Sequence, residues 1–328
     1  MVLEPTLQTI LEIFHSIVNS GTNMRVRVIL VVLILGLSSI PSTQARAPET
    51  LTDVGAVFGG VHVYANSSSN ASLDFSSMPA IVEDYTATWC ESCVRVEHAL
   101  NDVEETNNMQ QYHFHRFIGE SEDPLGSQEG DDRWNDRYEE RIPPTAIFNG
   151  TIRQVGSSPH GESLQDDYNS NLEKSLQLGA GTSMLTWVAG NGETSPSVSW
   201  NLVIDMANFP ENSTIKSSIW VVEEMVYFPE GGNGEDYYPE SVRAIVELGE
   251  ELSGTKEITL PAAYDGDDLE IHLIHEVILP EPVEETPDEN DTTVDEPIED
   301  AGGLPSISLI AVLAITMIAA ITVQRKQQ

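Results

Sequence analysis

Apolar residues recur with two different periods in the first half of the chain. Residues 80–86 (AIVEDYT) have the composition of a buried strand, and residues 91–105 (ESCVRVEHALNDVEE) place apolar side chains at helical spacing. A second strand is expected at residues 112–118, and further helices at residues 131–141 and 163–178. Strands that alternate with helices predict an α/β domain here.

The pattern changes to strands alone after the glycine-rich residues 179–181 (GAG). Alternation of apolar and polar positions is clearest at residues 198–204 (VSWNLVI). Strands separated by turn-rich stretches are expected at residues 183–188, 197–206, 217–228, 241–248, 256–260 and 269–277. This spacing predicts an antiparallel β-sandwich at residues 179–280, after the α/β domain at residues 48–178.

The N-terminal segment has the layout of a secretory signal peptide. From Met24, two arginines precede a short apolar run and a small-residue site that ends at Ala47. We therefore expect residues 1–47 to be a leader and signal peptide, with translation starting at Met24. The apolar run is shorter than the roughly 20 residues that cross a bilayer. Cleavage after Ala47 is therefore favoured over retention as an anchor.

The C-terminal segment has the pattern of a membrane anchor. Residues 304–323 are an uncharged apolar stretch of spanning length, followed by the basic residues Arg325 and Lys326. This order predicts a transmembrane helix and a cytoplasmic tail at residues 324–328. Residues 281–303 are rich in Glu, Asp, Pro and Thr, which predicts an acidic disordered stalk. The bulk of the chain is expected to be extracytoplasmic at the cell membrane.

The chain is strongly acidic. It contains 53 acidic and 15 basic residues, for a formal net charge of -38. Such a charge repels phosphate groups, which argues against nucleic acid as a partner. We interpret the acidity as a means of solvation rather than as evidence for an acidic substrate or for cation storage.

The chain has two cysteines, Cys90 and Cys93, at the expected junction between a strand and a helix. A thiol at a helix N-terminus faces unpaired backbone N–H groups and the positive end of the helix dipole, which favours its thiolate. Cys93, one turn further along, is placed to attack a mixed disulfide at Cys90. A structural disulfide and half of a zinc site are the alternatives, but a bridge over so short a loop stabilises a fold little.

Two sequence blocks resemble the thioredoxin-like superfamily. Residues 84–93 (DYTATWCESC) match its acidic strand residue, tryptophan and paired cysteines in register. Residues 142–150 (IPPTAIFNG) look like its cis-proline turn, followed by a strand and a hairpin. The resemblance implies a thioredoxin-like fold for the α/β domain and a redox-active Cys90–Cys93 disulfide that works without a bound cofactor.

The resemblance also implies roles for individual residues. Cys90 would be the attacking thiol and Cys93 the resolving thiol. Asp84 would be the buried carboxylate that takes or relays the proton of Cys93. These three residues are the expected catalytic group.

On the substrate side, Trp89 would form a flat wall beside the cysteines, and Pro144 would be the cis-proline that packs against the disulfide. Together with Pro143 and Thr145 they are the expected substrate-binding residues. The chain departs from the family at two points. Pro143 has no N–H to donate to a substrate strand, and a Glu-Ser dipeptide stands between the cysteines in place of the commoner Gly-Pro. Substrate docking is therefore expected to differ from that of the family.

His113 and His115 alternate in the second expected strand and therefore share one side of it. A thiol pair with histidine can bind copper, as in some thioredoxin-like metallochaperones. We interpret both histidines as surface residues and predict no metal site, with copper delivery as the least favoured alternative. His272 and His275 are interpreted as ordinary strand residues.

A thioredoxin-like domain followed by a β-sandwich is similar to the Omp28-related surface proteins, and residues 220–226 (WVVEEMV) and 237–248 carry that resemblance. It implies architecture and no chemistry. We therefore expect an enzyme, a membrane-anchored thiol-disulfide oxidoreductase that acts on thiols and disulfides of exported proteins. A separate redox partner protein would recharge it. The alternative is a surface binding or adhesion protein, with the thioredoxin-like fold as a scaffold.

Overall fold

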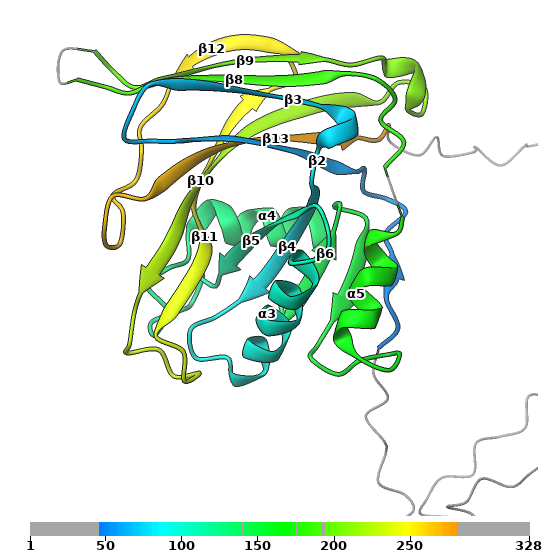
Figure 1. Cartoon of the computed structure of the whole chain (residues 1–328), viewed down its shortest axis with the longest axis vertical. Coiled ribbons are helices and arrows are strands. Elements are labelled where there is room, and N and C mark those ends of the chain that lie inside the picture. The colour runs from blue at the N-terminus through cyan, green and yellow to red at the C-terminus, as the bar shows by residue number, and fades with distance from the viewer. Residues whose placement is uncertain (1–45, 140, 175, 192–193, 281–328) are drawn as a thin grey trace, which may run out of the picture. The chain divides into compact units, whose positions relative to one another are not determined.

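The computed structural model describes residues 46–139, 141–174, 176–191 and 194–280, which form two β-sheets and a few helices (Figure 1). The larger sheet has nine strands in the order β1-β7-β6-β4-β5-β11-β10-β13-β2, and the smaller has four in the order β12-β9-β8-β3. The strands are β1 (Glu49–Thr50), β2 (Val57–Tyr64), β3 (Ser69–Asp74), β4 (Ala80–Thr86), β5 (Met109–His115), β6 (Thr145–Phe148), β7 (Ile152–Val155), β8 (Thr182–Val188), β9 (Ser197–Val203), β10 (Thr214–Tyr227), β11 (Tyr237–Gly249), β12 (Ser253–Glu257) and β13 (Leu269–Ile278). The helices are α3 (Glu91–Glu104), α4 (Gln128–Tyr138) and α5 (Leu164–Leu172), with short 3-10 helices η1 (Phe75–Ser77) and η2 (Met206–Asn208).

In the first half of the chain, β4 and α3 lie where the pattern predicted them, and two other elements begin earlier than expected. Strand β5 ends at His115 because its parallel partner β4 ends at Thr86, directly opposite. Helix α4 begins at Gln128 because the Ser127 hydroxyl accepts a hydrogen bond from the backbone N–H of Gly130, which caps the helix. Strand pairing and helix capping therefore explain why the observed bounds of β5 and α4 differ from the expected ones.

Five of the six strands expected in the second half are confirmed, as β8 to β11 and β13, whereas β12 (Ser253–Glu257) lies earlier than the expected residues 256–260. They do not form a unit of their own, because β2 and β3 complete their sheets. Strand β2 pairs with β13, and β3 pairs with β8, all antiparallel. Both β2 and β3 lie inside residues 48–178, the range expected for the first domain. The part of the chain that the structure describes therefore forms one compact unit across the expected boundary.

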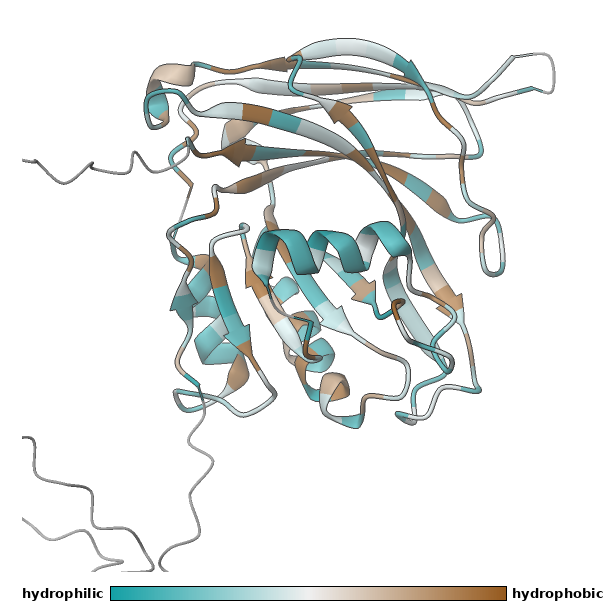
Figure 2. Ribbon diagram, turned by 180° about the vertical axis from the view of Figure 1, so that it is seen from behind, coloured by the Kyte–Doolittle hydropathy of each residue, from teal (hydrophilic) through white to brown (hydrophobic). Residues whose placement is uncertain are grey.

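Successive residues of β4 point to opposite faces of the large sheet and so divide its core in two. Val82 packs under α3 and α5, in a cluster that includes Leu100 and Tyr168. Ile81 and Tyr85 pack under α4. In Figure 2 the outer side of α4 is hydrophilic, as its sequence QEGDDRWNDRY requires. The central strands therefore lie between helical layers.

The small sheet packs on the strands β2, β10 and β13 of the large sheet. Trp187 from β8 and Trp200 from β9 enter a cluster with Val221 and Ile271 from the large sheet. Their indole N–H groups donate to backbone carbonyls, so these bulky side chains are buried without losing their hydrogen bonds. This second layer is the sandwich-like part of the molecule.

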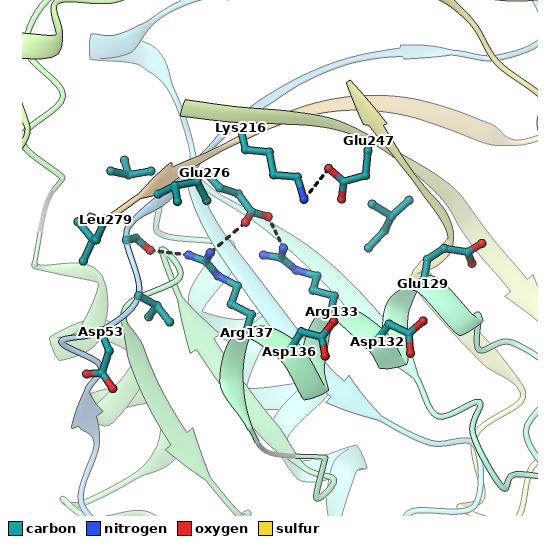
Figure 3. A pocket seen from close by; sticks show the side chains of 15 residues that line it. Asp53, Glu129, Asp132, Arg133, Asp136, Arg137, Lys216, Glu247, Glu276 and Leu279 are labelled. Atoms are coloured by element: carbon teal, nitrogen blue, oxygen red, sulfur yellow. Dashed lines mark hydrogen bonds and ion pairs between the residues drawn. The ribbon is translucent and has the colours of Figure 1, made fainter. Parts of the chain in front are cut away.

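Buried ion pairs tie α4 to β13 in the pocket drawn in Figure 3. Glu276 of β13 accepts hydrogen bonds from Arg133 and, at 2.9 Å, from Arg137. Arg133 also donates to Glu83 at 2.7 Å, and its guanidinium lies 4.7 Å from the ring centroid of Trp220. Although burial alone would raise the pKa of Glu276, the two arginines lower it overall. Arg133 and Arg137 therefore hold α4, from the first half of the chain, against β13, from the second half.

The Glu276→Gln variant is expected to lose about 3 kcal/mol of unfolding free energy, because it leaves a buried guanidinium without one of its carboxylates. Urea unfolding of the purified protein measures the loss. Glu247→Gln is the matched control, since Glu247 pairs with Lys216 at the exposed rim of the same pocket. That variant is expected to lose less than about 1 kcal/mol. Equal losses would show that the buried pairs do not hold the halves together.

His275 is a buried neutral histidine that joins three strands. It lies on β13, with Nε2 2.8 Å from the Ser183 hydroxyl and Nδ1 2.8 Å from the Ser217 hydroxyl. Burial lowers the pKa of His275 to about 3. Below about pH 6.5 the unfolded chain therefore binds a proton at His275 that the folded chain does not bind. The free energy of unfolding consequently falls as the pH drops from about 6.5 toward 3.

Lowering the pH from 7 to 5 is expected to cost the natural protein about 2 kcal/mol more than the His275→Gln variant, because glutamine does not titrate. Urea unfolding at the two pH values gives the difference, and comparison with the variant removes the contribution of the carboxyl groups. An identical pH response of both proteins would contradict a buried neutral His275.

Several expected segments lie outside the described residues. These are the leader up to residue 45, the stalk at residues 281–303, the transmembrane helix at residues 304–323 and the tail at residues 324–328. In the described ranges, the helices are all too short or too polar to cross a membrane.

Candidate functional site

The two cysteines form a disulfide at the start of α3. Cys90 occupies the N-cap position and Cys93 lies in the first turn, with their Cα atoms 5.3 Å apart. Cys90 is 5% exposed, whereas Cys93 is fully buried. The strand-to-helix junction is therefore where the sequence placed it, and an incoming thiol reaches Cys90 before Cys93.

Cys90 lines an open hollow that it shares with the proline turn. The lining residues are Trp89, Cys90, Glu91, Ser92, Arg95, Ile142 and Pro143. The peptide bond between Pro143 and Pro144 is cis, as expected from the sequence block. The disulfide and the proline turn, which are about 50 residues apart in sequence, thus border one surface feature.

Two of the expected substrate-binding residues, Trp89 and Pro143, line this hollow. Pro144 and Thr145 are buried behind it. The carbonyl of Pro144 accepts from the backbone N–H of Gly156, and the Thr145 hydroxyl donates to the carbonyl of Ile142 at 2.7 Å. Both residues therefore shape the turn from within.

Sequence reasoning missed Arg95 and Ile142 as lining residues. Arg95 lies one helical turn after Glu91, a spacing that could have placed both beside the cysteines. Ile142 is a large apolar residue that is 60% exposed next to the proline turn. The proline turn causes this exposure, and the periodicity of apolar residues gives no means of predicting it.

The two residues before Cys90 are held by the loop at residues 116–127. Asp123 accepts a hydrogen bond from the backbone N–H of Thr88 at 2.8 Å, and Glu120 accepts one from the indole N–H of Trp89 at 2.9 Å. His115 lies 2.8 Å from the same Asp123 carboxylate. Burial alone would raise the pKa of Asp123, but His115 and the backbone N–H groups lower it overall. The loop at residues 116–127 thus fixes the disulfide segment.

The hairpin of β10 and β11 holds the same segment from the other side. The carbonyl of Thr88 accepts from the backbone N–H of Asn233 at 3.0 Å and from the Tyr238 hydroxyl at 3.3 Å. A side-chain carbon added at Gly232 would lie 3.3 Å from Cβ of Trp89, so the hairpin loop packs closely on the tryptophan. These contacts come from the half of the chain to which the sequence assigned no role in the site.

Asp84 is fully buried, as expected, and lies in a cluster behind the disulfide. Asp84, Glu97 and His113 each bring one oxygen or nitrogen to within 4.8 Å of the others. Nδ1 of His113 lies 3.3 Å from Oδ2 of Asp84, and the Thr86 hydroxyl donates to Glu97 at 2.7 Å. Burial raises the pKa of Glu97. Burial alone would lower the pKa of His113, but the Asp84 carboxylate raises it overall.

The prediction that His113 and His115 are surface residues is wrong, because each is 2% exposed. They face inward, toward Asp84 and Asp123, since α3 and the loop at residues 116–127 cover that side of β5. Their position does not favour copper delivery. By type, the cluster of Asp84, Glu97 and His113 could hold a divalent cation. We do not assign it to a metal: Asp84 and His113 form an ion pair with each other, and Glu97 accepts a hydrogen bond from Thr86.

No protein-family description matches the chain, and no curated protein matches it. Among solved structures the chain is similar to HBP35 of Porphyromonas gingivalis, at 14% identity and a TM-score of 0.38, over 61% of this chain and 63% of that chain. It is also similar to protein AGR_C_4864 from Agrobacterium tumefaciens, at 13% identity and a TM-score of 0.33, over 61% of this chain and 78% of that chain. The match spans about 63% of the length of HBP35, and neither likeness assigns a fold or a function.

Removing the Asp123 carboxylate is expected to loosen the disulfide segment. In Asp123→Ala, the backbone N–H of Thr88 loses its acceptor, so its hydrogen exchange should speed up about tenfold or more. Hydrogen exchange followed by mass spectrometry of the peptide around Thr88 measures this. Glu122→Ala is the control, because Glu122 is exposed on the same loop. Equal exchange in the two variants would count against the role given to Asp123.

Proposed function

We propose that this protein is a thiol-disulfide oxidoreductase in which Cys90 attacks and Cys93 resolves. The observation that carries the proposal is the location of the disulfide: Cys90 caps α3 at the edge of an open hollow, and Cys93 is buried one turn behind it. The helix N-terminus stabilises a thiolate at Cys90. The buried sulfur is then the one that must exchange a proton with the protein interior.

We also propose that residues around the disulfide form a thioredoxin-like arrangement. Strands β4 and β5 are parallel, β6 and β7 follow antiparallel, and helices cover both faces. This order, together with the cis bond before Pro144, supports the resemblance of the two sequence blocks. In this arrangement Asp84 takes the proton of Cys93, and Trp89 and Pro143 meet the substrate.

The proposed substrates are thiols and disulfides of exported proteins, and a separate redox partner protein supplies or removes electrons. The direction of exchange follows from the reduction potential of that partner relative to the Cys90–Cys93 pair. The expected signal peptide and transmembrane anchor place the reaction outside the cytoplasm, where disulfides persist.

A binding or adhesion function is the second candidate, and an exposed aromatic pair favours it. Tyr227 and Tyr237 face each other across the β10–β11 hairpin, with ring centroids 5.0 Å apart, and both are largely exposed. Exposed aromatic side chains are typical of binding surfaces. This function would not need Cys90, which separates it from the first.

The purified protein is expected to accelerate the reduction of a protein disulfide by dithiothreitol at least about tenfold over the Cys90→Ser variant, because the attacking thiolate is lost. Turbidity of insulin measures the rate. The Cys93→Ser variant is expected to accumulate mixed disulfides through Cys90, which non-reducing electrophoresis detects. The proposal fails if the natural protein and Cys90→Ser reduce insulin at the same rate.

A further inference from the structure

Two carboxylates, from β4 and α3, lie close together in the interior. Asp84 is fully buried and Glu97 is 8% exposed. The ion pair that reaches Asp84 comes from His113, at 3.3 Å. In the described part of the chain, both oxygens of Asp84 and Nε2 of His113 have no hydrogen-bond partner. Asp84, Glu97 and His113 bring polar atoms to within 4.8 Å of one another in this buried region. Burial raises the pKa of Glu97 and so favours its protonated form.

This cluster adjoins the buried sulfur. Glu97 follows Cys93 by four residues on α3, so both side chains lie on the same buried face of the helix. Thr86, which donates to Glu97, precedes Ala87, and Ala87 packs against both cysteines. The proton-holding groups and the resolving sulfur therefore belong to one continuous buried region.

We propose that Glu97 and His113 act as positioning residues that share with Asp84 the proton exchanged by Cys93. The inference rests on the proposed function and deepens it: the proton is held by three groups on β4, α3 and β5, so removing either partner of Asp84 disturbs the resolving step. Their task is confined to the buried sulfur, because Cys90 opens to the hollow.

The step balances in both directions. During oxidation, the Cys90 thiolate first forms a mixed disulfide with an incoming disulfide, and the substrate leaves as a thiolate. The Cys93 thiol then gives its proton to the cluster, and its sulfur attacks Cys90. The bond from Cys90 to the substrate breaks, and its electron pair departs on the second substrate sulfur. During reduction, a substrate thiolate attacks Cys90 and forms a mixed disulfide, while the Cys93 sulfur leaves with the electron pair of the broken bond and takes the proton back from the cluster. The second substrate thiolate then displaces Cys90, which leaves as a thiolate, and the substrate is released as a disulfide.

The charged surroundings fit this role. Burial and the nearby Asp84 raise the pKa of Glu97, and Asp84 raises that of His113 above the value that burial alone would set. Other titratable groups also face the cluster, and these are His115 of β5, Glu240 and Tyr238 of β11, and Tyr168 of α5. Burial raises the pKa of Glu240 to about 8. Apart from His115, these neighbours bring no positive charge to the cluster.

A stopped-flow reaction of the reduced protein with 5,5'-dithiobis(2-nitrobenzoate) separates the two sulfurs. The first release of thionitrobenzoate reports attack by Cys90 and depends on reagent concentration. The second release reports attack by Cys93, and its rate does not depend on reagent concentration. In Glu97→Gln and His113→Gln, the second phase is expected to slow at least about tenfold at pH 7 and to become steeply pH-dependent, because Asp84 then loses one of the two groups with which it shares the proton of Cys93. The first phase is expected to change less than about twofold.

Glu104→Gln is the matched control, since Glu104 is exposed two turns further along α3, and both of its phases should match the natural protein. Glu97→Asp should restore the pH profile in part. If Glu97→Gln fails to fold by circular dichroism, His113→Gln and Glu97→Asp decide the result.

The outcomes distinguish the two proposals. If no Cys90-dependent first phase occurs, the proposed function fails. If the first phase is normal and the second keeps its natural pH profile in the variants, only the present inference fails. It is also overturned if the oxidised, chelator-treated protein binds Zn²⁺ stoichiometrically in a way that needs Glu97 and His113, because the cluster would then be a metal site.

Discussion

The fold depends on the continuity of the large sheet across β5. This strand pairs in parallel with β4 on one side and with β11 on the other, where Ser241 lies opposite His113. Without β11, β5 would present an open edge of unpaired N–H and C=O groups. The ring centroid of Trp220 lies 4.8 Å from that of Tyr112 and 5.2 Å from that of Phe114. The same junction is therefore also part of a hydrophobic core. If the two halves of the chain folded independently, they would therefore expose both the edge of β5 and these aromatic side chains.

This junction has a direct consequence for the site. Because β11 lies beside β5, the loop of its hairpin reaches the residues before Cys90, where Asn233 and Tyr238 hold the carbonyl of Thr88. The loop after β5 holds the N–H of the same residue through Asp123. A thiol pair at a helix start needs its backbone fixed to keep Cys90 at the surface and Cys93 inside. Here that rigidity comes from segments far apart in sequence.

Electrostatics divides the molecule into two regimes. Among the described residues, most carboxylates are at least partly exposed, where water screens each of them. Inside, Glu83 and Glu276 pair with Arg133, and Asp123 pairs with His115. Asp84 and Glu97 instead lie close to each other and to His113. The scarce arginines are thus used where burial makes an unpaired carboxylate most costly. Within the described ranges, the cluster around Asp84 has no arginine contact, which agrees with the proton exchange that we propose for it.

The sequence by itself determined the local features: the strand and helix that flank Cys90 and Cys93, the cis peptide bond before Pro144, and the strands of the second half. The strands and the helix follow from periodicity, whereas the cis bond was expected from the resemblance of residues 142–150 to the thioredoxin-like proline turn. It did not determine that His113 and His115 are buried, that β2 and β3 complete the sheets of the second half, or that Glu97 joins Asp84. Those outcomes depend on which elements pack against each other. The local sequence around a residue does not indicate which distant segment will cover it. Only tertiary packing decided them, because burial changes the protonation and hydrogen bonding of a side chain without changing its place in the pattern.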